Sequence, residues 1–327
     1  MARHNLSARA CVLMAAVLAM GLAPAPARAE YPDHSITIVV PFAPGGASDY
    51  MARLLSTHFR DRFGQTVVVE NKPGAGGNIG IGDVARAKPD GYTFLVSSSV
   101  FVVNPGLYRQ APYDPIKGFA PVTELISSPN VIAVRADAGI KDLDDLIAKA
   151  NADPGKFNYS TPGTGTSTNL MMELLKTKKK FNIVHVPYHG AAPAVQALLA
   201  GQVQATSMTL PVVLPFVKAG KLKCLVVTGD RRWADLPDVP TITEAGFADS
   251  VNETFQALFA PAGTPQAIID RVAREVIAIY QAPDLKKSLR ESGYRVTAAG
   301  PKPLADLVAH EVPMWSETIR KAGIPLH

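Results

Sequence analysis

Short apolar runs rich in β-branched residues alternate with longer amphipathic segments along this 327-residue chain. The first run covers residues 36–40, and similar runs cover 66–70, 92–97, 131–135, 157–160, 183–186, 203–207 and 222–227. Between the first two runs, Met51, Leu55 and Phe59 recur at helical spacing. Such alternation predicts parallel strands joined by helices that cover both faces of a sheet, an α/β fold.

The length and composition fit this fold. Hydrophobic residues make up 47% of the chain and charged residues 19%, which is enough apolar material for a large core. At roughly 150 residues per domain, the length predicts about two domains. We find no internal repeat, so solenoids and propellers are excluded.

The N-terminus has the pattern of a secretory signal peptide. Arg3 and Arg9 precede an apolar run at 11–23, and Ala-Arg-Ala at 27–29 forms an A-x-A cleavage pattern before Glu30. The run is about 13 residues long, too short to span a bilayer as an uncleaved anchor, which is the alternative. We therefore expect a signal peptide at 1–29 and a periplasmic mature protein.

Removal of this segment changes the charge. It holds three of the 33 basic residues and none of the 28 acidic ones, so 30 basic and 28 acidic side chains remain, a net charge of about +2. This balance gives no reason to expect nucleic-acid binding. Cys224 is then the only cysteine, and its place in an apolar run predicts a buried thiol without a disulfide.

A first candidate site follows the strand at 36–40. Ligands of open α/β sheets bind beyond the carboxyl ends of strands, where free N–H groups of the next helix favour an anion. Gly45 and Gly46 allow close approach, and Ser48 and Asp49 suit the first helical turn. The alternative is an ordinary turn between strand and helix.

A second candidate site, residues 159–169, has the same order of strand, hydroxyl-rich turn and helix. Its alternative is simple helix capping by Thr166 or Ser167. Two such turns in separate halves of the chain could hold a carboxylate between domains without any arginine.

Other motifs point to no cofactor, metal or catalytic centre. Residues 80–85 match G-x-G-x-x-A, but they follow a glycine loop instead of a strand, so we do not expect a nucleotide. His185 and His189 are four residues apart, but Pro187 between them prevents the helix that would align them for a metal. No local Ser/His/Asp arrangement supports an enzyme.

At these residues the chain resembles the Bug/TctC extracytoplasmic solute receptors, the substrate-binding components of tripartite tricarboxylate transporters. The resemblance covers nearly the whole mature chain. The matching stretches are 38–46 with Asp49, 69–77 with Gly80, 88–93, 113–115, 119–122, 186–188 with Gly190, 200–203 and 218–222.

The resemblance implies a monomeric, two-domain receptor of periplasmic-binding-protein type, a Venus flytrap in which each domain is a mostly parallel sheet flanked by helices. Domain 1 would comprise 30–126 plus 257–327, and domain 2 would comprise 127–256. Crossovers would lie near 123–129 and 254–261. The two turns are similar to the family's carboxylate-holding loops.

Four positions depart from the family's usual pattern. Asn169 replaces a frequent His, His189 a common Lys or Arg, and Gln204 and Met208 typical Asp residues. We expect Met208 and Thr209, at a strand end, to face the distal part of the ligand. A thioether cannot pair with an ammonium group, so a mono- or dicarboxylate with an apolar or aromatic body is expected, and aspartate and glutamate are not. The alternative is that Met208 merely packs in the sheet.

The predicted function is capture of a small organic carboxylate and its delivery to membrane transporter subunits. A sensory receptor for a membrane signalling kinase, or an exported enzyme, are the alternatives. The candidate ligand-binding residues are Phe42, Ala43, Gly45, Gly46, Ala47, Ser48, Asp49, Ser97, Ser98, Thr164, Gly165, Thr166, Ser167, Tyr188, His189, Met208 and Thr209.

Overall fold

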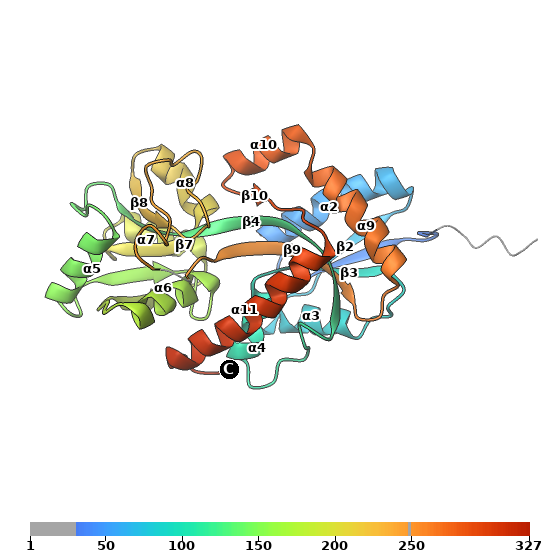
Figure 1. Cartoon of the computed structure of the whole chain (residues 1–327), viewed down its shortest axis with the longest axis horizontal. Helices are drawn as coiled ribbons and strands as arrows, with labels where there is room; N and C mark the ends of the chain where they lie inside the picture. Colours follow the sequence, from blue (N-terminus) through green and yellow to red (C-terminus); the bar gives the residue numbers. More distant parts are fainter. Residues whose placement is uncertain (1–30, 248–249) are drawn as a thin grey trace, which may run out of the picture. The chain divides into compact units, whose positions relative to one another are not determined.

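The structure is a computed structural model that describes residues 31–247 and 250–327. The signal peptide predicted at 1–29 lies outside the described residues. Residues His34–His327 form one compact unit, and the described strands form a ten-stranded sheet in the order β2-β1-β3-β9-β4-β7-β5-β6, with β8 and β10 also pairing with β4 (Figure 1). None of the helices in these described ranges combines the length and apolarity of a membrane span.

The first strand group consists of three parallel strands. They are β1 (Ile36–Val40), β2 (Val67–Asn71) and β3 (Thr93–Ser98), with helices α2 (Ala47–Phe63), α3 (Asn78–Ala85) and α4 (Val100–Leu107) and the short helix η1 (Ala75–Gly77). Helix α2 buries Met51, Leu55 and Phe59, the residues at helical spacing in the sequence. It ends at Gly64, whose φ of 67° is left-handed, a common helix end at glycine.

The second strand group consists of three further parallel strands. They are β5 (Asn158–Thr161), β6 (Val184–Pro187) and β7 (Ala205–Thr209), with helices α5 (Leu143–Ala152), α6 (Ser167–Lys178), α7 (Ala191–Leu199) and α8 (Leu210–Lys218) and strand β8 (Leu222–Val227). Separate apolar clusters form around it, one with Tyr159, Met171 and Leu175, the other with Val195, Met208 and Val213. Cys224 lies in the second cluster and is buried, as predicted.

Two long antiparallel strands join the groups. Strand β4 (Phe119–Arg135) has 17 residues and pairs with β9 (Glu253–Pro261) over its first part and with β7 and β8 over its last part (Figure 1). The α/β prediction is confirmed, but the sheet is mixed, because β9 runs antiparallel to β3 and β4 antiparallel to β7. The strand predicted at 131–135 is the end of β4.

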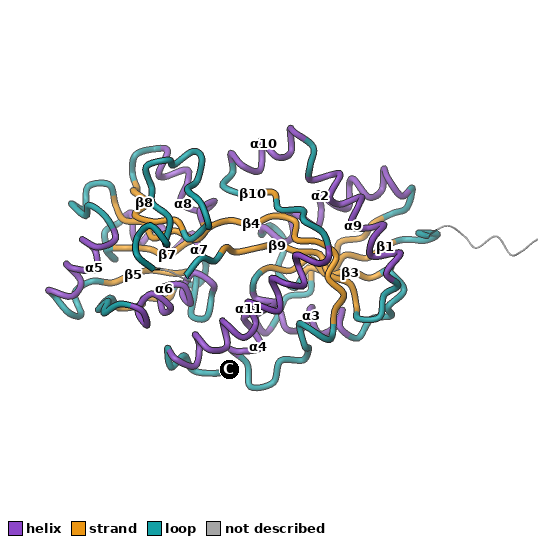
Figure 2. Tube along the Cα trace, in the orientation of Figure 1, coloured by secondary structure: helices purple, strands orange, loops and turns teal. Residues whose placement is uncertain are grey.

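The C-terminal part is mainly helical. It contains α9 (Gln266–Tyr280), α10 (Pro283–Glu291), the short strand β10 (Arg295–Val296) and α11 (Pro301–Lys321). Figure 2 shows helices on both sides of the strands. Helix α11 contacts α4, β4 and α6. Trp315 and Ile319 of α11 share an apolar cluster with Leu107 of α4 and Leu170 of α6, so α11 packs against helices of both strand groups.

Candidate functional site

The first predicted turn joins β1 to α2, and the carboxylate of Asp49 supports it through hydrogen bonds. Asp49 accepts hydrogen bonds from Gly45 N, Arg53 Nε and Asn71 Nδ2, each at 3.0 Å. Asn71 also donates to Phe42 O at 3.0 Å. The Arg53 hydrogen bond is the largest cause that holds the pKa of Asp49 at about 2. Asp49 therefore supports the turn through its hydrogen bonds, and the ligand contact expected for it stays a prediction.

Other residues of this turn face the solvent. Ala43, Gly45 and Gly46 are exposed, and a β-carbon at Gly46 would have no heavy atom within 4 Å. Gly46 is the N-cap of α2 and supplies no side-chain cap. The first N–H groups of a helix without such a cap are available to an external acceptor, and the helix dipole favours an anion there.

The second predicted turn joins β5 to α6 and is more tightly bonded within itself. Thr166 caps α6 by accepting from Asn169 N, so the capping role left open in the sequence is present. Asn169 Oδ1 accepts from Gly165 N at 2.9 Å. His185 supports the turn, because its Nε2 lies 2.7 Å from Thr161 Oγ1 and its ring stacks on Tyr159.

The loop between β6 and α7 lies against this second turn. Tyr188 N donates to Thr161 O at 3.1 Å, and Gly190 N donates to Pro162 O at 3.0 Å. The structure therefore brings Tyr188 and the exposed His189 next to the second turn, as the prediction requires. Pro187 ends β6 just before this loop.

Both helix starts bond to one face of β9. Ser48 of α2 donates to Gln256 Oε1 at 2.6 Å, and Ser167 of α6 lies 2.9 Å from Thr254 Oγ1. Thr254 itself donates to Asn130 Oδ1, so its hydroxyl accepts from Ser167. Residues two apart on a strand point to the same face, which places the two helix starts side by side along β9.

Sequence reasoning missed Gln256 and Thr254. They lie in the segment predicted as a crossover, where polar residues interrupt an apolar run. That interruption is the signal that could have identified them. Ser98 lies beside Gln256 in the pairing of β3 with β9, so the β3 end also reaches this position.

Ser97 has an unusual environment. Its side chain is fully buried, and its hydroxyl has no hydrogen-bond partner among the residues that the structure describes. A buried hydroxyl without a partner is unfavourable, and in native structures such a group calls for an explanation. It lies near the carboxyl end of β3, but it pairs with Ala257 of the apolar cluster, so its side chain is on the face opposite Ser98 and Gln256. The ligand contact predicted for Ser97 stays a prediction.

The placement predicted for Met208 is wrong. Its side chain is fully buried and packs with Val131, Val195 and Val213 between the sheet and its helices. Strand β7 is covered on both faces, so only its end can reach a ligand; there Thr209, the N-cap of α8, is half-buried. The alternative, that Met208 packs in the sheet, describes the structure.

The chemistry around the two turns is that of neutral hydrogen-bond groups. Apart from the ion pair of Asp49 with Arg53 at the first turn, the side chains that converge there are hydroxyls and amides. Burial lowers the pKa of His185, which favours its neutral form. Across the described ranges, no group of three His, Cys, Asp or Glu residues could hold a metal ion. The arrangement suits an anion held by N–H groups and hydroxyls.

Known proteins resemble this chain over most of its length. Residues 51–324 match the family described as the tripartite tricarboxylate transporter family receptor, TctC. Protein BugT of Bordetella pertussis is 34% identical over 305 residues, which cover 92% of this chain and 94% of BugT.

Two similar structures are described as complexes with a ligand. R. palustris Rpa4515 with adipate is 33% identical, has a TM-score of 0.79 and covers 91% of this chain and 100% of its own. MatC from Rhodopseudomonas palustris with bound malate is 32% identical, has a TM-score of 0.75 and covers 88% of this chain and 100% of its own. These similarities agree with the resemblance inferred from the motifs and with the α/β architecture. The chain belongs to the TctC family of tripartite tricarboxylate transporter receptors.

Proposed function

We propose that this protein is a periplasmic receptor that binds a small organic carboxylate at the starts of α2 and α6 and delivers it to a tripartite tricarboxylate-type membrane transporter. The observation that carries the proposal is the convergence of Ser48 and Ser167 on one face of β9. It places the uncapped start of α2, which suits an anion, beside the start of α6, which Thr166 caps.

The ligand carboxylate would be held without a formal positive charge. In this proposal the uncapped start of α2 supplies N–H groups, Ser98 supplies a hydroxyl from the end of β3, and Thr164 supplies one from the second turn. Such hydrogen bonds to a carboxylate are charge-assisted, so a few of them give substantial affinity. Adipate and malate, named with the two similar structures, are the first compounds to test on this chain.

The two strand groups would act as the two domains of the receptor. In this proposal, residues 30–126 with 257–327 form one domain and 127–256 the other, and β4 and β9 connect them. Each domain would contribute one turn to the ligand, so the ligand would stabilise the arrangement in which the turns approach one another.

A thermal-shift screen of the mature protein against organic acids tests this function. A ligand present at 100 times its Kd adds about 2.7 kcal/mol to the free energy of unfolding, which gives a clear rise in Tm. The screen should contain adipate, malate, an aromatic dicarboxylate, glutamate and a neutral sugar. We expect carboxylates to raise Tm and the sugar to leave it unchanged.

Two outcomes would contradict the proposal. One is stabilisation by the sugar or by amino acids alone. The other is chemical conversion of a stabilising acid, detected by NMR over hours. Such conversion would indicate an enzyme. Calorimetric titration of each hit then gives the stoichiometry, for which one ligand per chain is expected.

A further inference from the structure

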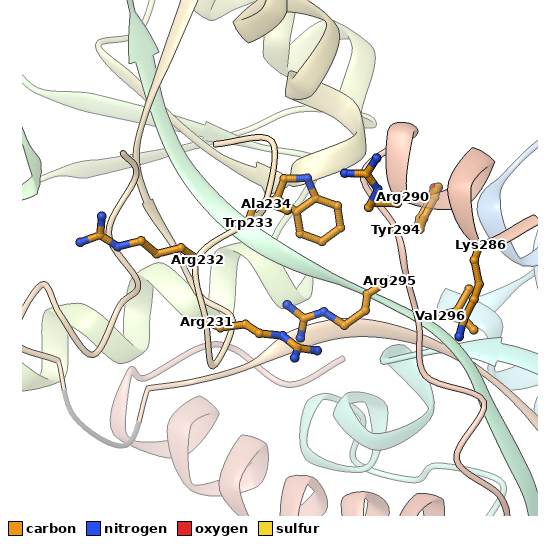
Figure 3. A pocket seen from close by; sticks show the side chains of 9 residues that line it. All are labelled: Arg231, Arg232, Trp233, Ala234, Lys286, Arg290, Tyr294, Arg295 and Val296. Atoms are coloured by element: carbon orange, nitrogen blue, oxygen red, sulfur yellow. The ribbon is translucent and has the colours of Figure 1, made fainter. Parts of the chain in front are cut away.

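A second cavity lies away from the two turns. It has a volume of about 420 Å³ and lies between the loop that follows β8 and the segment from α10 to β10 (Figure 3). This volume is within the range of small-molecule sites. Arg231, Lys286, Arg290 and Arg295 line it together with Trp233 and Tyr294. It therefore combines several cations with aromatic surface.

Ion pairs fix the two walls of this cavity to one another. Arg290 pairs with Asp235 at 2.7 Å, and Arg295 pairs with Asp230 at 3.0 Å and with Glu253 at 3.1 Å. Arg232 points away from the other cations in Figure 3 and pairs with Glu244 at 2.9 Å. These pairs give the cavity a defined form.

Two lining cations keep charge that is available to a ligand. Arg231 has only a 3.8 Å approach to Asp230, an acid that already pairs with Arg295. Lys286 bonds to the Gln281 amide and has no acidic partner in the described part of the chain. Arg231 comes from the loop after β8 and Lys286 from α10, so the available charges stand on opposite walls.

Two aromatic side chains, Trp233 and Tyr294, belong to the lining of the cavity. Trp233 is 4% exposed, and its indole nitrogen has no partner among the described residues. The Arg295 guanidinium lies over the indole ring, 6.0 Å from its centre. The indole nitrogen is buried and does not reach the cavity. Cations beside aromatic rings favour an organic anion over a simple inorganic ion.

We propose that this cavity is a second ligand site, which binds an organic anion with an apolar body and two or more acidic groups. One acidic group pairs with Arg231 and another with Lys286, while the body lies against Trp233 and Tyr294. The occupant would connect the loop after β8 with α10. This site is independent of the carboxylate site at the two turns.

The probe is benzene-1,3,5-tricarboxylate. Its binding to the mature protein is measured by Trp fluorescence and by calorimetry. Trp233 and Trp315 are the two tryptophans of the sequence. We expect the probe to change the fluorescence of the wild type, and Trp233→Phe to remove that change. In Arg231→Ala/Lys286→Ala, the probe Kd should rise about tenfold or more, as expected when two charged contacts are lost.

Arg60→Ala/Lys287→Ala is the matched control. Arg60 has the same 3.8 Å approach to a neighbouring acid, Asp61, and similar exposure to Arg231, while Lys287 is the neighbour of Lys286 on α10. The control should change the probe Kd by less than about twofold. Equal losses in the two double variants would overturn the proposal, since they would indicate general surface attraction.

Gly46→Val separates this site from the first one. It should leave probe binding unchanged, because Gly46 lies in the first turn and does not line the cavity. Loss of probe binding in Gly46→Val, or absence of binding to the wild type at millimolar probe, would overturn the second site. Neither result depends on whether adipate or malate binds at the two turns.

Discussion

Gly165 lies directly against Leu107, although the two residues come from different strand groups. A β-carbon at Gly165 would stand 2.7 Å from Leu107 Cδ1, and Gly165 has a φ of +76°. Leu107 is held in the apolar cluster of α4 and α11, so it cannot move away easily. The second turn is therefore seated on a helix of the first strand group and tolerates no side chain there.

Gly165→Ala should lower the free energy of unfolding by about 1–3 kcal/mol and weaken carboxylate binding, because the turn must shift. Gly139→Ala is the matched control, since Gly139 has a φ of +64° but no atom within 4 Å of an added β-carbon. Urea unfolding of both variants separates backbone strain from the contact with Leu107. Equal destabilisation by the two changes would contradict the packing argument.

Gly46→Val should weaken carboxylate binding about tenfold or more without loss of stability. The φ of −85° and ψ of 175° at Gly46 are extended and accept a β-branched residue, and the position is open. The added methyl groups would occupy the space above the start of α2, where we place the ligand. Calorimetry with the best acid from the screen measures the effect. Normal affinity in this variant would remove the first turn from the site.

A half-buried carboxylate on β4 and a buried one on α11 predict an unusual dependence of stability on pH. Burial is the main cause that raises the pKa of Glu124 to about 8, and the nearby Glu253 charge raises it further. Burial also raises the pKa of Glu311 to about 7. The folded state thus binds protons that the unfolded state, with a pKa near 4.5, has released.

This stabilisation is fully present below about pH 4.5 and is lost as the pH rises through about 7 and then 8. Unfolding by urea at pH 6 and pH 9 should show a lower free energy of unfolding at pH 9, by on the order of 4 kcal/mol. Glu124→Gln, which keeps the shape and removes the titration, should reduce this difference. An unchanged pH profile in Glu124→Gln would exclude Glu124 as its source.

The periodic elements could be predicted from the sequence because each depends on local spacing. Met51, Leu55 and Phe59 mark α2, and the run at 222–227 matches β8. Helix α4 was missed, since its sequence is apolar except for Asn104 and contains Pro105, so it has no amphipathic period. Its existence depends on packing against α11, which spacing cannot reveal.

The candidate site was predictable as two separate turns, but their relationship was not. Gln256 and Thr254 bond to the two helix starts from more than 80 residues away along the chain, so the polar interruption of their apolar run does not reveal which helices they meet. Met208 shows the opposite error. Its position at a strand end suggested a ligand contact, but helices cover both faces of β7, and the expected rejection of amino acids therefore loses its basis.

Substitution of Ser97 should distinguish an effect on ligand binding from an effect on stability. Its buried hydroxyl has no partner among the described residues, so Ser97→Ala removes no hydrogen bond from the fold. We expect an unchanged or slightly higher free energy of unfolding, by up to about 1 kcal/mol, because a desolvated polar group is lost. If the hydroxyl donates to the ligand, the same change should raise the Kd for the carboxylate about fivefold to thirtyfold.

Ser99→Ala is the comparison two residues away. Ser99 Oγ accepts a hydrogen bond from Phe255 N at 3.0 Å, so its removal leaves a buried N–H without a partner. That variant should lose about 1–3 kcal/mol of stability in urea unfolding. Calorimetry and urea unfolding should give opposite patterns for the two variants if Ser97 contacts the ligand, because Ser99 supports the fold. Destabilisation by Ser97→Ala with unchanged affinity would show instead that its hydroxyl supports β3, and would remove Ser97 from the proposed site.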